Sequence, residues 1–419
     1  MKIAFYFNDY KELNETGTFT AFTQTKQQFL NLNCDYINFC CIIESEQGNT
    51  ELIDEVEKFS LHDEHHKLLK EHSLTVSKLR FRIGSYINRI FNFFYIESSI
   101  KHPSPESDYN KYLELKTIAF ENIVRRENID LVVYNHYFYF PSLNVPYILI
   151  AWDFAHKNII GHLEFLDQFD WREKIFYEVL QKAYKVITCN EAGKHELINY
   201  GHIPEERIEI IPFSHPVVPE IPFGGKFPDV ITKRFIFLPA AFWAHKNHIT
   251  LLKAFRLLMN GLESNDLQLV LAGPDKGNRK YIEEQIRELG LNEKVVILGF
   301  VERNLIWELY RRAEMLVFPT LLGPNNLPPL EALSVGCPAV ISGIEGHREQ
   351  FGDTVLYFDP FDEKDLASKI LSLLGNDELK CKLIESGNQL LSNHKPEHYL
   401  QRMLPIFEEF RVHRSTYKS

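Results

Sequence analysis

The stretch Phe318–Val340 reads FPTLLGPNNLPPLEALSVGCPAV, and it contains the signals that decide the fold. An apolar run ends near Thr320, and a loop with glycine and proline follows. A helix is predicted to begin around Pro328, because proline suits the first helical turn. Another apolar run, Pro338–Ser342, comes after that helix. The order strand, helix, strand is typical of a parallel sheet, whose strands need crossover connections.

The same alternation extends through the second half of the chain. Short apolar runs alternate with longer segments of helical period, as in a parallel sheet that is covered on both faces. The other predicted strands are Arg234–Ala240, Leu267–Gly273, Lys294–Phe300, Met315–Thr320 and Thr354–Phe358. We therefore predict a doubly wound α/β domain over residues 216–395.

Residues 1–215 follow a looser version of the same plan. The predicted strands are Lys2–Phe7 and the apolar runs at 36–43, 130–138, 146–154 and 185–190. Gly17 lies between the first strand and a helix. A glycine there can let the backbone approach a phosphate or sugar, or it can simply permit a tight turn. The polar stretch His102–Tyr109 is predicted to be a loop.

The segment Pro212–Pro228 holds five prolines and two glycines, a composition typical of a linker. Two α/β domains on a short linker form a cleft, and open parallel sheets bind ligands beyond the carboxyl ends of their strands. We therefore expect the site between the two domains. Residues 396–419 are predicted to be a helical segment that returns to the N-terminal domain.

Composition excludes several classes of protein. The 419 residues include 46 Lys+Arg and 57 Asp+Glu, so the net charge of −11 argues against a nucleic-acid binder driven by bulk charge. The 6 cysteines form no CxxC pair, and the 17 histidines show no metal-ligand spacing with carboxylates. We expect no metal, no cofactor besides a substrate, and a cytoplasmic location.

No segment has the roughly 18 consecutive apolar residues that a membrane helix needs. Ser77–Ile96 departs from this soluble pattern, because its apolar and cationic residues fall on opposite faces of a helix. Such a helix can lie at a membrane interface. It can equally be a surface helix of a globular protein. Peripheral contact with the inner face of a membrane therefore stays one of two interpretations.

Glu331 and the residues before it suggest the chemistry of the site. Asn325 and Asn326 precede the predicted helix, whose free N–H groups attract phosphate. Glu331 is predicted to fall within the first turn of that helix, where a carboxylate would repel a phosphate but could accept hydrogen bonds from the hydroxyls of a ribose. The alternative is that Glu331 only interacts with the helix dipole.

A second group of polar residues follows the first strand of the C-terminal half, in the segment Phe242–His248 (FWAHKNH). His245 and Lys246 lie in the turn between strand and helix, on the same side of the sheet as the Glu331 loop. A cation there can offset the charge of a diphosphate leaving group. A lysine in a turn can also be merely solvated. Asn247 is expected to cap the helix.

With these residues in view, the whole chain resembles the retaining glycosyltransferases of family 4, which have the GT-B architecture of two Rossmann-like, doubly wound domains facing across a cleft. The resemblance is carried by FWAHKNHITLLKAF, by VVILGFVERNLIWELYRRAEMLVFPT, and by GPNNLPPLEALSVGCPAV with GHREQFGDTVLYFDP. It implies that Glu331 is the ribose ligand and that Lys246 faces the phosphates. Phe300 and Val301 correspond to the segment that meets the nucleobase.

The resemblance also implies the rest of the donor site. Asn325, Asn326 and Leu327 match the loop that presents backbone N–H groups to the donor sugar and diphosphate. Gly323 and Pro324 of the same loop are also expected to contact the donor. His245 and Gly17 complete the expected donor contacts.

Three departures from the family pattern stand out. The first glutamate of the family's Glu-x7-Glu motif falls on Gly323, a common basic residue falls on Ala241, and a histidine falls on Trp152. They affect the expected contacts to the donor, and the chain is still expected to be an active enzyme.

The expected reaction is transfer of a hexosyl group from a nucleotide diphosphate sugar to a glycan or lipid-linked glycan acceptor, with retention, in surface polysaccharide synthesis. Lys246, Glu331 and Asp153 are the expected catalytic residues, and His136 and His156 are candidates for acceptor contacts. Resemblance to mannosyl-type polysaccharide enzymes favours GDP-mannose. Two alternatives stay open: a nucleotide-sugar epimerase of the same fold, and a catalytically silent scaffold in a polysaccharide assembly complex.

Overall fold

The computed structural model describes residues 1–9, 38–45, 57–60, 105–134, 144–158, 169–214, 216, 218, 226–261, 266–324 and 326–418. Four of the sequence predictions lie outside these ranges. They concern Gly17, His136, Asn325 and the amphipathic segment Ser77–Ile96.

The N-terminal domain is built on a seven-stranded parallel sheet of order β3-β2-β1-β4-β5-β6-β7. Its strands are β1 (Lys2–Asp9), β2 (Asn38–Ser45), β3 (Glu57–Ser60), β4 (Leu131–Tyr134), β5 (Tyr147–Ile150), β6 (Lys185–Thr188) and β7 (Ile208–Ile210). Its described α-helices are α4 (Pro105–Arg126), α5 (Ala155–Asn158), α6 (Phe169–Glu178) and α7 (Glu191–Asn199). Short 3-10 turns cover Leu180–Lys182 and Glu205–Arg207. This is the predicted doubly wound plan.

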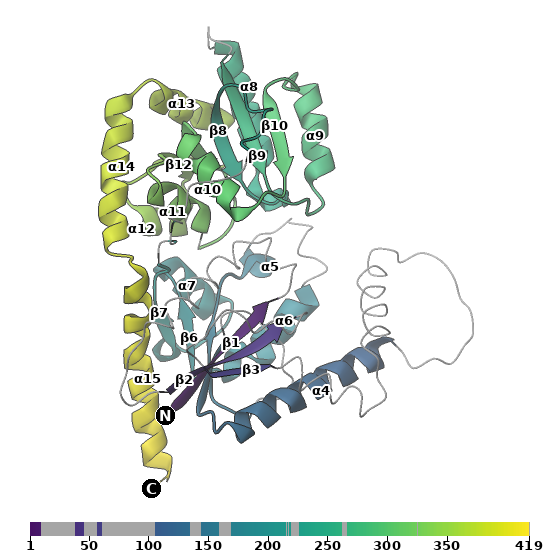
Figure 1. Ribbon diagram of the computed structural model, residues 1–419, viewed down its shortest axis with the longest axis vertical. Helices are drawn as coiled ribbons and strands as arrows, with labels where there is room; N and C mark the ends of the chain where they lie inside the picture. The colour runs from purple at the N-terminus through teal and green to yellow at the C-terminus, as the bar shows by residue number, and fades with distance from the viewer. Residues whose placement is uncertain are drawn as a thin grey trace, which may run out of the picture.

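The C-terminal domain has a six-stranded parallel sheet of order β10-β9-β8-β11-β12-β13 (Figure 1). Its strands are β8 (Arg234–Pro239), β9 (Leu267–Ala272), β10 (Val295–Gly299), β11 (Met315–Phe318), β12 (Ala339–Ser342) and β13 (Leu356–Phe358). Its helices are α8 (His248–Gly261), α9 (Arg279–Glu288), α10 (Arg303–Arg312), α11 (Leu327–Ser334), α12 (Glu345–Phe351), α13 (Glu363–Leu374) and α14 (Asp377–Ser392). The predicted strands of this half are confirmed, because runs buried on both faces are apolar throughout.

The order of the C-terminal strands fixes where a ligand can bind. The chain leaves β8 toward β9 on one side and later returns to β11 on the other side. The crossovers therefore diverge between β8 and β11, and open α/β sheets bind ligands at the carboxyl ends of strands at such a point. The segments that follow β8 and β11 contain Lys246 and the loop before α11.

The buried residues of β1 show how the two layers are packed. Ile3 and Phe5 belong to a cluster that also includes the C-terminal domain, whereas Ala4 and Tyr6 face a second cluster with α4 and α6. Successive side chains of a strand point to opposite faces of the sheet, which accounts for this alternation.

The final helix, α15 (Pro396–Lys418), runs down the side of the N-terminal domain (Figure 1). The ring of Phe407 packs edge-on against that of Phe5 at 6.3 Å, and Tyr184 donates a hydrogen bond to Glu409 at 3.0 Å. The chain thus crosses from the C-terminal domain and ends against the first sheet.

The sequence prediction was wrong at one element and incomplete at others. His102–Tyr109 was predicted to be a loop, but α4 begins at Pro105. Proline lacks only an N–H that is unpaired in the first helical turn, so it starts this helix without cost. The short strands β3 and β7 were not predicted, since few residues define their pattern.

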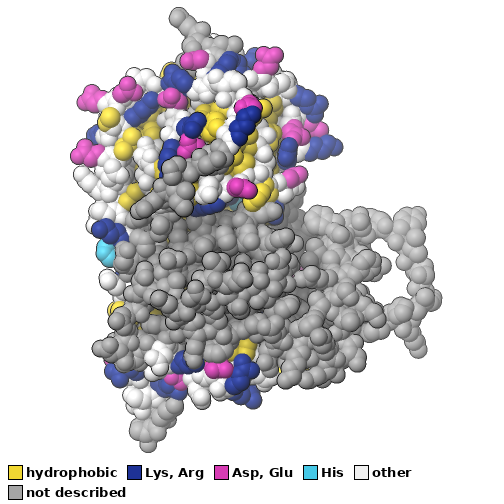
Figure 2. All heavy atoms as spheres, in the orientation of Figure 1, with side chains coloured by type: hydrophobic (Ala, Val, Ile, Leu, Met, Phe, Trp, Pro, Cys, Tyr) yellow, Lys and Arg dark blue, Asp and Glu magenta, His cyan; other side chains and the backbone are white. Residues whose placement is uncertain are grey.

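On the face drawn in Figure 2, Lys/Arg and Asp/Glu side chains are interspersed over the described surface of the C-terminal domain. A mixed surface of this kind leaves charge recognition to individual side chains. Among the described helices, none combines the length and the apolar character needed to cross a membrane.

Candidate functional site

The turn after β8 and the loop after β11 are joined by backbone hydrogen bonds. The N–H of Leu321 donates to the carbonyl oxygen of His245 at 2.8 Å, and the Thr320 hydroxyl donates to the same oxygen at 3.4 Å. The Lys246 Nζ lies 5.2 Å from the centre of the Phe318 ring, at the end of β11. The structure therefore brings Lys246 and His245 to the loop before α11, as strand ends at a common edge require.

Asn326 has a different role from the predicted helix cap. It directly precedes α11, but its side chain makes no capping hydrogen bond. Its Nδ2 donates instead to the carbonyl oxygen of Gly323 at 3.1 Å and to Nε2 of His347 at 2.8 Å. The amide thus ties the loop to α12.

His347 is held in its neutral form. Its Nδ1 lies 2.8 Å from the carbonyl oxygen of Ser342, an acceptor, so Nδ1 carries the proton and Nε2 accepts from Asn326. Burial lowers the pKa of His347 to about 4, the Ser342 hydrogen bond opposes this shift, and the charge of Lys246 adds to it.

The start of α11 offers fewer N–H donors than an ordinary helix. The residue before a helix and its first three residues normally leave their N–H groups unpaired. Here Pro328 and Pro329 occupy two of these positions and have no N–H. Of these four positions, only those of Asn326 and Leu327 carry a backbone N–H.

Glu331 does not lie in the first turn of α11, contrary to the sequence prediction, because the helix already begins at Leu327. Its side chain is 4% exposed. Oε1 accepts a hydrogen bond from Arg303 at 2.7 Å, and Oε2 accepts one from the Tyr310 hydroxyl at 2.8 Å. Burial and the neighbouring carboxylate raise the pKa of Tyr310 well above its usual value, so the phenol stays a donor.

The segment expected to meet a nucleobase lies beside this carboxylate. Phe300 follows β10 and is 55% exposed, whereas Val301 packs against the core. Arg303 begins α10, and its guanidinium lies 4.9 Å from the ring centre of Trp307. Arg303 therefore connects the end of β10 to Glu331.

Gly323 adopts a φ of +113°, which residues with side chains rarely adopt. The loop backbone is therefore suited to glycine at this position. A glutamate there, as the resembled family would have, would introduce strain.

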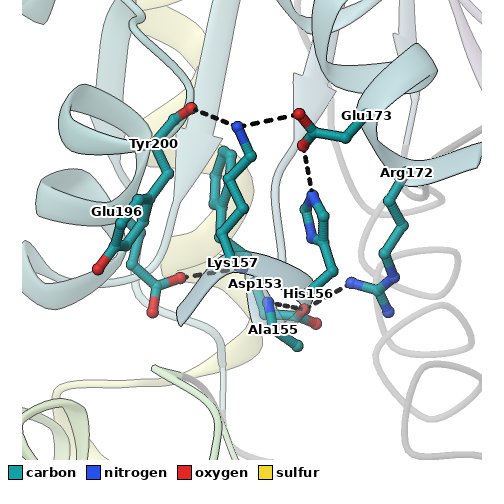
Figure 3. A network of polar contacts seen from close by, with 9 residues as sticks. Asp153, Ala155, His156, Lys157, Arg172, Glu173, Glu196 and Tyr200 are labelled. Carbon is teal, nitrogen blue, oxygen red and sulfur yellow. Dashed lines mark hydrogen bonds and ion pairs between the residues drawn. The ribbon is translucent and has the colours of Figure 1, made fainter. Parts of the chain in front are cut away.

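Asp153 lies just beyond the end of β5, on the side of the N-terminal domain that faces the C-terminal domain (Figures 1 and 3). Its Oδ1 accepts hydrogen bonds from Arg172 at 2.8 Å and from the Ala155 N–H at 2.9 Å. Burial by itself raises the pKa of Asp153, but Arg172, the Ala155 N–H and the nearby His245 together hold it below its usual value. Asp153 is thus ionised, and its field reaches a residue of the other domain.

His156 is enclosed within the N-terminal domain. Its ring stacks on Phe176 at 4.9 Å, and its Nε2 lies 2.8 Å from Glu173 Oε1 (Figure 3). Its side chain has no exposed surface. Burial lowers the pKa of His156, and the hydrogen bond that Glu173 accepts from its ring opposes that shift. His156 was predicted as a candidate for acceptor contacts, but in this structure its ring packs α5 against α6.

The two domains meet around these residues. Ala155 of α5 and Leu322 of the loop after β11 are buried against each other. Asn190 Nδ2 donates to the carbonyl oxygen of Pro324 at 2.5 Å. The loop before α11 is therefore in contact with both domains.

Five residues of this region were missed by sequence reasoning: Arg172, Asn190, Arg303, Tyr310 and His347. Arg303, Tyr310 and His347 carried a usable signal, since all three lie in segments that the family resemblance already covers. Within the described ranges, no group of three or more His, Cys, Asp or Glu side chains could hold a metal ion.

Comparison with known proteins gives the family. Residues 226–390 match the family model of glycosyl transferases group 1. An uncharacterized glycosyltransferase of Methanocaldococcus jannaschii is 28% identical over 177 residues, which are 40% of this chain and 44% of that protein. O-antigen chain mannosyltransferase B of Escherichia coli is 27% identical over 219 residues, or 50% of this chain and 57% of that protein. The chain thus spans about half the length of these curated relatives.

Solved structures give the fold over the whole chain. S. aureus TarM in complex with fondaparinux, alpha-GlcNAc-glycerol and UDP superposes with a TM-score of 0.69 at 15% identity, covering 97% of this chain and 100% of that one. The predicted two-domain architecture is confirmed. The C-terminal domain is therefore similar to the group 1 glycosyl transferases, and the chain has the GT-B fold.

Proposed function

We propose that this protein transfers a hexosyl group from a nucleotide diphosphate sugar to a hydroxyl of a glycan or lipid-linked glycan, with retention at the anomeric carbon. The observation that carries this proposal is the meeting of three elements at the divergence of β8 and β11. They are the turn with Lys246, the loop before α11, and the start of α5 in the opposite domain, where Ala155, two residues after Asp153, packs against Leu322. These elements supply a cation, backbone donors and a carboxylate, as an anionic leaving group and a hydroxyl acceptor require.

Lys246 and the N–H groups of Asn326 and Leu327 would bind the diphosphate. The barrier to glycosyl transfer comes from separating an electron-poor sugar from an anionic leaving group, and fixed positive charge stabilises that separation. The Lys246 ammonium lies beside an aromatic ring and near a neutral histidine, so part of its surroundings is already desolvated.

Glu331 would hold the ribose of the donor. A carboxylate offers about four lone-pair sites, and Arg303 and Tyr310 occupy one on each oxygen. The remaining sites suffice for two ribose hydroxyls. Arg303, whose side chain is 42% exposed, is the element that a nucleoside would contact first.

Asp153 would accept a hydrogen bond from a substrate hydroxyl. Its lowered pKa keeps it ionised at neutral pH, and Arg172 fixes its orientation. An oriented carboxylate strengthens the nucleophilicity of a hydroxyl that donates to it.

We further propose that the sugar is mannose, that the donor is GDP-mannose and that the product is a surface polysaccharide. The O-antigen mannosyltransferase name of the Escherichia coli relative supports this choice. The absence of a metal or further cofactor, a cytoplasmic location and peripheral membrane contact through Ser77–Ile96 stay predictions.

The test is incubation of the purified chain with UDP-, GDP- and dTDP-sugars, each with and without a mixture of glycan acceptors. We expect release of one nucleoside diphosphate, enhanced by acceptor, and its loss in Lys246→Ala. Lys253→Ala is the matched control, because Lys253 is exposed on the adjoining helix α8. A rearranged sugar formed without acceptor would instead indicate an epimerase. If the protein neither binds nor turns over any of the donors, it is a silent scaffold.

A further inference from the structure

Asn190 joins the two domains through both ends of its side-chain amide. It is the N-cap of α7, where its Oδ1 accepts a hydrogen bond from the Gly193 N–H at 2.9 Å. Because Oδ1 is directed at the helix, Nδ2 must point the other way, and it donates to the Pro324 carbonyl oxygen at 2.5 Å. The side chain is 3% exposed, so water does not compete for these bonds.

The same end of α7 is bound a second time by the C-terminal domain. Glu349 of α12 accepts hydrogen bonds from the N–H groups of Glu191 at 2.7 Å and Ala192 at 3.2 Å. A carboxylate at a helix N-terminus is favoured both by the unpaired N–H groups and by the helix dipole. A residue of one domain thus completes the cap of a helix in the other.

Pro324 is confined on its other side by α12. A Cβ built on Gly346 would lie 2.7 Å from both Cα and the carbonyl oxygen of Pro324, so only glycine allows this approach. Asn326 holds the neighbouring Gly323 carbonyl within the same loop. The backbone of the loop is therefore set by contacts to α12 and, on the side of the N-terminal domain, by the Asn190 hydrogen bond and the packing of Leu322 against Ala155.

We infer that Asn190 is a positioning residue for the donor loop, defined as residues 321–326. It acts through Pro324, so that the loop adopts its donor-binding geometry only when the N-terminal domain is seated against α12. This inference rests on the proposed function, and it makes donor affinity depend on a side chain of the domain opposite the donor.

Asn190→Ser is the decisive variant. Serine is about as good an N-cap as asparagine, so the cap of α7 is kept while the donor to Pro324 is lost. We expect the Michaelis constant for the nucleotide sugar to rise about 2- to 10-fold, as for loss of one neutral hydrogen bond. The Michaelis constant for the acceptor should change little.

The matched control is Asn376→Ser. Asn376 is the N-cap of α14, where its Oδ1 accepts a hydrogen bond from the Leu379 N–H at 2.9 Å. In the described part of the chain, its side chain makes no hydrogen bond to the donor loop. This variant should leave the donor Michaelis constant unchanged. A role of Asn190 in stability alone would reduce the active fraction of enzyme, and hence kcat, in Asn190→Ser without changing its donor Michaelis constant.

Amide hydrogen exchange gives a readout that needs no donor. In Asn190→Ser we expect faster exchange at Leu321, Leu322 and Gly323 than in the wild type, and no such change in Asn376→Ser. Unchanged exchange, or an unchanged donor Michaelis constant, would overturn the inference. If the wild type turns over no donor, the proposed function fails, and the exchange result still decides whether Asn190 positions the loop.

Discussion

Replacing Glu331 by alanine tests the ribose contact most directly. The structure leaves one lone-pair site on each carboxylate oxygen after Arg303 and Tyr310 are satisfied. A hydrogen bond to a charged group contributes about 1.5–3 kcal/mol. Since about 1.4 kcal/mol is tenfold in affinity, loss of one ribose hydroxyl should weaken nucleotide binding to the wild type about 10- to 100-fold.

The assay is isothermal titration calorimetry with a nucleoside diphosphate and its 2′-deoxy analogue. Wild-type protein should prefer the ribonucleotide, and Glu331→Ala should bind the two about equally. The quantity measured is the coupling between the carboxylate and the hydroxyl, which a double-mutant cycle isolates from any general weakening. A preference that survives in Glu331→Ala would refute the placement of the ribose.

Tyr310→Phe is the control for damage to the fold. It leaves the carboxylate in place but removes the hydrogen bond at Oε2, so a buried acceptor loses its partner. We expect a loss of about 1–3 kcal/mol in the free energy of unfolding. The preference for the ribonucleotide should persist in this variant.

Three further predictions concern the charges around the site. Lys246→Met should weaken nucleoside diphosphate binding about 10- to 100-fold and leave binding of the free nucleoside unchanged in calorimetry; equal losses would contradict a phosphate contact. Asp153→Asn should keep the donor dissociation constant and lower kcat for transfer by about tenfold or more, measured as product formation. Burial lowers the pKa of His347 to about 4 and of His248 to about 3. Because both histidines take up a proton on unfolding below about pH 6.5, each should lower the free energy of unfolding by about 2 kcal/mol as the pH falls from 7 to 5. Urea titrations that show equal stability at both pH values would contradict this.

The C-terminal sheet could be predicted closely because its strands are buried on both faces. All six strands of this sheet begin and end within two residues of the predicted runs. The meeting of Lys246 with the loop after β11 also followed from the sequence, since the carboxyl ends of parallel strands share one edge.

The partners of Glu331 could not be predicted in the same way. Arg303 and Tyr310 are 28 and 21 residues away in sequence. They reach the carboxylate only because α10 packs against α11 at one particular rotation. Sequence periodicity shows which face of a helix is buried, but not which polar residue at its margin meets a neighbouring helix.

The helix α4 shows a different limit. Its buried residues Leu115, Ala119, Phe120 and Ile123 follow a helical spacing that the sequence does contain. The prolines and serines before it directed the prediction toward a loop instead. Proline in a first helical turn and proline in a loop have the same local signature, and only the apolar residues that follow distinguish them.

The two prolines at the start of α11 determine how the proposed donor site must work. They set the entry of the helix, but they remove two of the four N–H groups that a helix terminus would offer to a diphosphate. The charge of the leaving group must then be met largely by Lys246 and by the geometry of the loop. With only two N–H groups at the start of α11, donor binding would depend strongly on their orientation, and the contacts from α12 and from Asn190 that hold the carbonyl groups of the preceding loop would serve to fix it.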